Sequence, residues 1–165
     1  MIGRIKEINE LQQCYQSNRS EFVIIYGRRR VGKTYLVHEL FEKEFAFHYV
    51  GAHHLAKDKQ LSNFARRLQS FSGSAFPPTC KNWFEAFNFL QDYLASLQTK
   101  TKKVVFFDEM PWIDTPPFAS YSSLCDNSVN TLQFITFFSF NFLSKCCVCR
   151  VFLLRRLEKN LGGLL

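Results

Sequence analysis

Apolar residues along the first two thirds of the chain follow two different spacings. Between residues 3 and 16 they recur every three or four positions, which predicts an amphipathic helix. The same spacing predicts three further helices, over residues 33–43, 61–71 and 83–97. Short, continuous apolar runs predict strands buried on both faces, over residues 22–26, 45–50 and 104–107. Helices and strands therefore alternate, which predicts an α/β fold with a parallel sheet covered by helices.

Two local signals mark the ends of these elements. The glycine- and proline-rich residues 73–78 predict a loop before the last of the four helices. Asn82, followed three positions later by Glu85, matches a capping box at the start of that helix.

The most specific motif follows the first predicted strand and opens the second predicted helix. It reads GRRRVGKT and matches the phosphate-loop pattern G-x-x-x-x-G-K-[ST] in full. Glycine lets the backbone bend closely around phosphate oxygens, and successive N–H groups and a helix N-terminus then favour an anion. The candidate nucleotide-binding residues are Gly27, Arg28, Arg29, Arg30, Val31, Gly32, Lys33 and Thr34.

Within this motif, Lys33 is expected to reach the β- and γ-phosphates, and Thr34 to offer its hydroxyl to Mg²⁺. A plain glycine turn beside a basic run is the alternative interpretation, but it does not explain why lysine and threonine follow the second glycine directly. The three arginines in the variable positions raise the positive field. They are candidates for contact with nucleotide phosphate, nucleic acid or an acidic neighbour, or for simple solvation.

A second candidate site stands at the end of the third predicted strand. There, an apolar run leads directly into Asp108 and Glu109. In phosphate-loop proteins an acid at this place holds the magnesium ion, and Asp108 fits that role. Glu109 is the candidate general base that orients and deprotonates water. The alternative is a strand end with two solvated acids.

Four segments together resemble the archaeal-type ATPases, an AAA-like family of phosphate-loop ATPases. The segments are Gly3-Arg4-x-x-Glu7, residues 25–34, residues 81–87 and residues 107–114, and the resemblance covers about residues 2–117. It implies an ATP-binding, P-loop NTPase-type domain of three layers with a five-stranded core sheet. It also implies that a later strand with a polar sensor residue lies between the strands that end at Gly27 and Asp108, and that a helical lid and a nuclease-like domain follow.

The chain departs from this family pattern after Pro117, so we divide it into an ATPase core (1–117) and an atypical Phe/Ser/Cys-rich tail (118–165). Between Thr115 and Ser144 the only charged residue is Asp126. No sensor motif, arginine finger or lid is recognisable in the tail. Residues 132–140 are the candidate replacement strand, with Ser139 or Asn141 as its polar residue. The alternative hypothesis is a truncated or frame-disrupted segment, which resequencing of codons 115–155 would test.

Other features of the tail and loops predict less. The apolar run at residues 131–143 is shorter than the roughly 20 residues that cross a membrane, so no membrane span is expected, and a buried or aggregation-prone strand is favoured. Cys146 and Cys149 have metal-like spacing without a second pair. His53 and His54 are adjacent and precede a predicted helix, where they would not share a face, so a metal pair is not expected there.

The composition and net charge indicate the class of binding partner but not a particular partner. The chain is 47% apolar, with 21 basic and 14 acidic residues, a net charge of +7 and a pI near 9.2. It can bury a core, and anionic partners are favoured. No signal peptide is recognisable at residues 1–9, which predicts a cytoplasmic protein with free thiols.

Three functions follow from these patterns. The first is ATP binding with Mg²⁺-dependent hydrolysis, in which Lys33 and Glu109 are the catalytic residues and Thr34 and Asp108 hold the metal. The second is a nucleotide-binding remnant without turnover, whose sheet would lack its central strand. The third is a basic nucleic-acid-binding module. The sequence does not identify a protein partner, an oligomeric state or the process that ATP would drive.

Overall fold

A computed structural model describes residues 4–18, 20–27, 30–98, 101–109, 134–141 and 150–154, and for the last two ranges it gives the course of the backbone. The helices are α1 (Ile5–Gln16), α2 (Lys33–Phe41), the 3₁₀ helix η1 (Glu42–Glu44), α3 (Lys57–Ser72) and α4 (Trp83–Ser96). The strands are β1 (Glu21–Gly27), β2 (Phe45–Val50), β3 (Lys103–Asp108), β4 (Phe134–Asn141) and β5 (Arg150–Leu154). The fold is mixed α/β, as the alternating pattern predicts.

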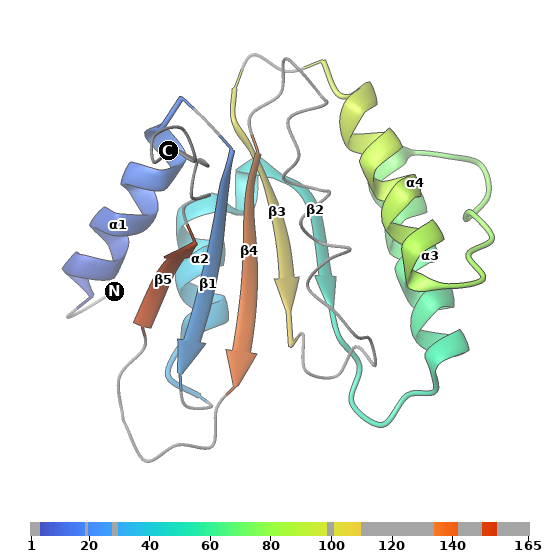
Figure 1. Cartoon of the computed structure of the whole chain (residues 1–165), viewed down its shortest axis with the longest axis horizontal. Helices are drawn as coiled ribbons and strands as arrows, with labels where there is room; N and C mark the ends of the chain where they lie inside the picture. Colours follow the sequence, from blue (N-terminus) through green and yellow to red (C-terminus); the bar gives the residue numbers. More distant parts are fainter. Residues whose placement is uncertain are drawn as a thin grey trace, which may run out of the picture.

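The strands form one five-stranded sheet in the order β2-β3-β4-β1-β5. Strands β1 to β4 run parallel to one another, and β5 pairs antiparallel with β1 at the sheet edge. Figure 1 shows the carboxyl ends of β1, β2, β3 and β4 at the same edge of the sheet. The parallel sheet that the alternating pattern predicts is therefore present in β1–β4, whereas the antiparallel edge strand β5 was not predicted.

Strand β4 occupies the position that decides the sheet's arrangement. It pairs with β1 on one side, where Ile24 stands opposite Phe138, and with β3 on the other, where Phe107 stands opposite the same residue. The strand predicted over residues 132–140 is thus confirmed with slightly shifted ends. A sheet without its central strand, which the hypothesis of a remnant assumed, is not what the structure shows.

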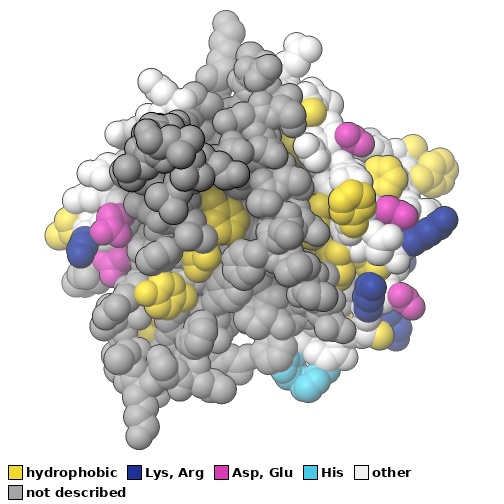
Figure 2. All heavy atoms as spheres, viewed as in Figure 1, with side chains coloured by type: hydrophobic (Ala, Val, Ile, Leu, Met, Phe, Trp, Pro, Cys, Tyr) yellow, Lys and Arg dark blue, Asp and Glu magenta, His cyan; other side chains and the backbone are white. Residues whose placement is uncertain are grey.

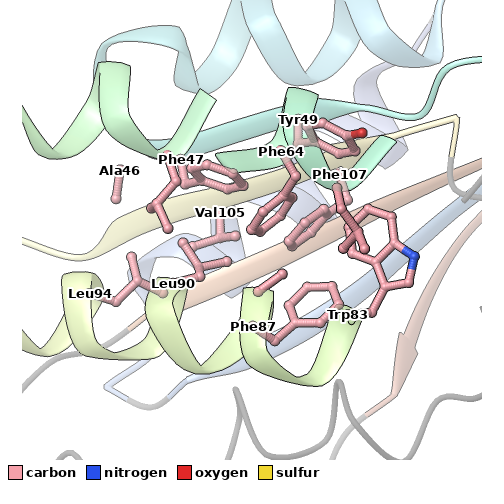
Figure 3. Packing of buried hydrophobic residues seen from close by; sticks show 13 residues of the cluster. Ala46, Phe47, Tyr49, Phe64, Trp83, Phe87, Leu90, Leu94, Val105 and Phe107 are labelled. Carbon is pink, nitrogen blue, oxygen red and sulfur yellow. The ribbon is translucent and has the colours of Figure 1, made fainter. Parts of the chain in front are cut away.

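The first core lies between α3, α4 and the sheet. Phe64 of α3 is fully buried, and its ring centroid lies 5.2–5.6 Å from those of Phe47, Tyr49, Trp83 and Phe87. Figure 3 shows these rings packed together with the aliphatic side chains of α4 and β3. Burial of each such side chain contributes about 1.5–3 kcal/mol, so this cluster fixes both helices against the strands.

A second core joins α1 and α2 to the sheet. It contains Leu11, Cys14, Val23, Ile25, Leu36, Val37, Phe41, Val104 and Phe106. Strand β3 gives Val105 and Phe107 to the first core and Val104 and Phe106 to the second. Because successive side chains of a strand point to opposite faces, β3 is covered on both.

The predicted helix boundaries hold with local exceptions. The helix expected over residues 33–43 ends at Phe41, and the charged residues that follow form η1. Helix α3 begins before the apolar stripe that predicted it. Its first turn is polar, so the apolar spacing did not reveal that turn. At α4 the Glu85 amide donates to Asn82 Oδ1 at 2.9 Å, and the Glu85 carboxylate accepts from the Lys81 amide at 2.9 Å. The cap is confirmed, although the Glu85 carboxylate accepts from the Lys81 backbone amide and from Asn82 Nδ2 rather than from the Asn82 backbone amide.

Candidate active site

The glycine-rich motif lies between the carboxyl end of β1 and the first turn of α2. Strand β1 ends at Gly27, and α2 begins at Lys33. Gly32 is the N-cap of α2 with φ +79°, a left-handed conformation that glycine adopts without strain. A Cβ at Gly32 would meet no atom of the described residues within 4 Å, so the backbone angle is what requires glycine here.

The start of α2 has the geometry of an anion site. Its first amides have no carbonyl partner within the helix, because intrahelical bonding begins where the Leu36 amide donates to the Gly32 carbonyl at 3.0 Å. Lys33, the first helical residue, is only 5% exposed. A helix N-terminus with a buried lysine favours a bound anion such as phosphate.

The two predicted metal ligands meet in the structure. Thr34 Oγ1 donates a hydrogen bond of 2.6 Å to Asp108 Oδ2. Thr34 comes from the first turn of α2, and Asp108 ends β3 with 5% exposure. A hydroxyl and a carboxylate are hard oxygen ligands of the kind that Mg²⁺ takes, so this pair fits the ion.

Asp108 is held on its backbone as well as its side chain. Its carbonyl accepts from the Gly51 amide at 2.9 Å, and its Oδ1 accepts from the Glu109 amide at 2.9 Å. The carboxylate therefore has a fixed orientation toward Thr34. Glu109 follows directly and is partly buried, with φ +53°.

Unusual backbone angles gather at this edge of the sheet. Among the described residues, the non-glycine residues with positive φ are Arg30 at 62°, His54 at 56° and Glu109 at 53°. They lie in the segments that follow β1, β2 and β3 respectively. Such conformations cost about 1–3 kcal/mol each and concentrate at functional sites. In parallel α/β sheets ligands bind beyond the carboxyl ends of the strands, where all three residues lie.

Arg4 reaches the same loop from the N-terminal end of α1. Its Nη2 donates a hydrogen bond to the Val31 carbonyl. Sequence reasoning placed Arg4 in a resemblance motif only and missed this contact. Nothing in the local pattern relates Arg4 to Val31, because the two residues come together through the packing of α1 on the second core.

His48 lies on β2 near this site, stacked on the Phe106 ring at 4.9 Å between centroids. Burial, helped by the charges of His38 and Arg67 and opposed by the Asp108 carboxylate, lowers the pKa of His48 to about 4. Its Nε2 is buried without a hydrogen-bond partner among the described residues. His48 is therefore neutral at physiological pH.

The remaining sequence candidates are placed as follows. Arg28, Arg29, Cys146 and Cys149 lie outside the described residues. His53 and His54 lie in a turn between β2 and α3. Figure 2 shows histidine side chains at the same edge of the molecule as the strands' carboxyl ends in Figure 1. Within the described part of the chain, no three potential metal ligands form a cluster, and no helix has the length and apolar character to cross a membrane.

Comparison with known proteins identifies the family of the chain. Residues 1–124 match the model of a family described as an ATPase domain predominantly from Archaea. Because the match covers most of the chain, the chain belongs to this family, and the resemblance drawn from its motifs is confirmed.

Two relatives come from Methanocaldococcus jannaschii. The uncharacterized protein MJECL04 is 31% identical over 114 residues, which cover 67% of this chain and 22% of that protein. The uncharacterized ATP-binding protein MJ0423 is 37% identical over 43 residues, which cover 26% of this chain and 73% of that protein. The chain thus spans about a fifth of the length of MJECL04.

Proposed function

We propose that the chain is a P-loop NTPase-type, three-layer domain that binds ATP and hydrolyses it with Mg²⁺, and that residues 1–117 supply its ATPase core. The observation that carries the proposal is the 2.6 Å bond between Thr34 and Asp108. Two motif residues that are remote in the sequence converge here beside the N-terminus of α2. The family match and the name of the ATP-binding relative agree with nucleotide binding.

In this proposal the loop binds the triphosphate through its backbone. The amides of the Gly27–Thr34 motif surround the phosphates, and the Lys33 ammonium neutralises their charge. Arg30, which is exposed at the loop, adds positive potential. Thr34 and Asp108 hold Mg²⁺, which when bound neutralises charge on the β- and γ-phosphates.

Hydrolysis then depends on the residue after Asp108. Glu109 orients a water molecule and accepts its proton as the water oxygen attacks the γ-phosphorus, while the bond from that phosphorus to the β,γ-bridging oxygen breaks and ADP leaves. The bond between the Glu109 amide and Asp108 Oδ1 couples the position of the base to that of the metal ligand. Catalysis of this kind works by positioning and electrostatics.

The polar sensor is assigned to β4. Within this strand, Ser139 stands in register with Ile25, and Asn141 stands in register with Gly27, the first residue of the phosphate loop. Asn141 is therefore the better placed of the two sequence candidates, because the strand's last position adjoins the loop.

Lys33 is the residue whose removal tests the proposal. Labelled ATP is titrated into the wild-type chain, Lys33→Ala and the control Lys43→Ala, since Lys43 is exposed in η1. We expect Lys33→Ala to abolish Mg-ATP binding and Lys43→Ala to preserve it. Unchanged affinity in Lys33→Ala would refute the phosphate-loop assignment.

Phosphate release measured on the same samples separates turnover from simple binding. Mg-ATP binding without steady-state phosphate release would identify the nucleotide-binding remnant that the sequence also allows. The nucleic-acid-binding module remains a prediction from the net charge of +7, and DNA binding that weakens steeply with salt would favour it.

A further inference from the structure

Arg4 connects the N-terminal helix to the phosphate loop. It is the N-cap residue of α1, and its guanidinium donates through Nη2 to the Val31 carbonyl, 27 residues away. Val31 lies immediately before Gly32 and the first residue of α2. The contact therefore acts on the part of the loop that leads into the candidate phosphate site.

The geometry of the peptide bond converts this contact into control of an amide. The bond between Val31 and Gly32 is trans, as are all peptide bonds in the described residues. In a planar trans peptide the C=O and the next N–H point in opposite directions. When Arg4 holds the Val31 carbonyl on its own side, the Gly32 N–H is directed away from Arg4. Gly32 alone, with freedom at positive φ, would leave this direction less fixed.

Helix α1 is itself anchored at its other end, which gives Arg4 a fixed support. Lys102 Nζ donates to the Cys14 carbonyl at 2.6 Å, to the Ser17 carbonyl at 3.1 Å and to Ser17 Oγ at 2.8 Å. Lys102 is only 8% exposed and immediately precedes β3. Helix α1 thus spans from the amino end of the strand that carries Asp108 to the loop that Asp108 faces.

The rest of the Arg4 guanidinium strengthens its electrostatic effect. Its Nη1 is buried and has no hydrogen-bond partner among the residues that the structure describes. A cation that is partly removed from water acts on nearby groups through a lower effective dielectric. Arg4 therefore adds positive potential beside the loop while it fixes the backbone.

We propose that Arg4 is a positioning residue for phosphate binding: by holding the Val31 carbonyl it directs the Gly32 amide toward the polyphosphate. This inference rests on the proposed function, because it concerns how the same loop recognises its ligand. It assigns Arg4 an effect on the phosphates rather than on the nucleoside.

Comparing ATP with inorganic tripolyphosphate tests this assignment. Affinities for both, with Mg²⁺, are measured calorimetrically for the wild-type chain, Arg4→Ala, Arg4→Lys and the control Arg66→Ala, an exposed arginine on α3. We expect Arg4→Ala to weaken both ligands by the same factor, about tenfold, because a charged hydrogen bond to the loop is lost. We expect Arg4→Lys to restore part of the loss and Arg66→Ala to change neither affinity.

The outcomes distinguish this inference from the function on which it rests. If Arg4→Ala weakens ATP but leaves tripolyphosphate unchanged, Arg4 contacts the nucleoside and the inference is overturned. Wild-type affinity for both ligands in Arg4→Ala also overturns it, with the proposed function intact. If the wild-type chain binds neither ligand, both fail. Thermal melts without ligand verify folding. If Arg4→Ala does not fold, the same comparison is made with Arg4→Lys, which should lower the affinities for ATP and tripolyphosphate by the same, smaller factor.

Discussion

Thr34 Oγ1 and Asp108 Oδ2 lie 2.6 Å apart although their residues are separated by 74 positions in the chain. One begins a helix and the other ends a strand, and neither is a neighbour of the other within any local element. Their contact means that the packing of α2 and β3 on a shared core sets the distance between the two candidate metal ligands. This hydrogen bond joins the candidate phosphate loop to the acidic end of β3.

The first prediction concerns the metal. Thr34→Val keeps the side-chain volume but removes the hydroxyl, and Asp108→Asn removes the negative charge. We expect each variant to lose most of the gain in ATP affinity that Mg²⁺ gives the wild-type chain, because one hard ligand is gone. Titration with labelled ATP in Mg²⁺ and in EDTA measures this gain. Thr79→Val, at an exposed threonine, is the control, and a full Mg²⁺ effect in Asp108→Asn would contradict the assignment.

The second prediction separates binding from hydrolysis. Glu109→Gln preserves shape and hydrogen bonding but removes the base, so ATP affinity should remain within about twofold while phosphate release falls at least about 100-fold. Single-turnover phosphate release and equilibrium ATP binding are measured together, with the exposed Asp92→Asn as the control. Equal rates in Glu109→Gln and the wild-type chain would rule out Glu109 as the general base.

The third prediction compares the two polar positions of β4. Because Asn141 is in register with Gly27 at the strand end, Asn141→Ala should slow phosphate release about tenfold or more while ATP still binds. Ser139→Ala, two positions earlier in the same strand, should have a smaller effect. The reverse order of effects in a phosphate-release assay would place the sensor at Ser139 instead.

The fourth prediction is a pH dependence of stability. The folded-state pKa of His48 is lowered from 6.5 to about 4, chiefly by burial. The unfolded chain therefore binds the proton first as the pH falls, so the free energy of unfolding should drop between pH 6.5 and pH 4. We expect His48 to contribute about 2 kcal/mol of this drop. Urea titrations at several pH values should show a flatter profile for His48→Phe, which keeps a ring on Phe106.

A matched histidine provides the control for that experiment. His54 is exposed in the turn after β2, so His54→Phe should leave the slope between pH 6.5 and pH 4 close to that of the wild-type chain. A slope in His48→Phe that equals the wild-type slope would mean that other groups carry the acid sensitivity.

The fifth prediction concerns the cap of α4. Asn82→Ala removes the acceptor of the Glu85 amide, and the free energy of unfolding should fall by about 1 kcal/mol. Asn88→Ala, at an exposed interior position of the same helix, should instead raise stability slightly, because alanine favours a helix. Urea unfolding of both variants measures the difference, and equal effects would argue against the cap.

Much of the candidate site could be located in the sequence because its residues are contiguous. The phosphate loop needs Gly32, Lys33 and Thr34 in immediate succession, and the acidic end of β3 is recognisable from the apolar run before Asp108. Arg4 was not predictable in the same way. Its partner is a backbone carbonyl, which every residue has, so no residue type at position 31 marks the contact.

The two strands of the tail differ in the same way in how far the sequence predicted them. The apolar run that forms β4 was recognisable as a strand, but the antiparallel β5 was not foreseen. Apart from Arg150, β5 is apolar, and an apolar strand has no polar face to show which side is buried. The place of β5 depends on its pairing with the edge of β1, which is remote in the sequence.

The sequence by itself determined the helices and strands of residues 4–109, the cap at Asn82 and the identity of the phosphate-loop and acidic residues, because periodicity and short motifs act over a few neighbouring positions. The family resemblance implied that a later strand lies between β1 and β3, but only the tertiary structure decided that β4 fills this place, that Thr34 contacts Asp108 and that Arg4 holds Val31. These relationships arise when distant apolar faces are buried together, and that burial depends on the whole chain rather than on any one segment.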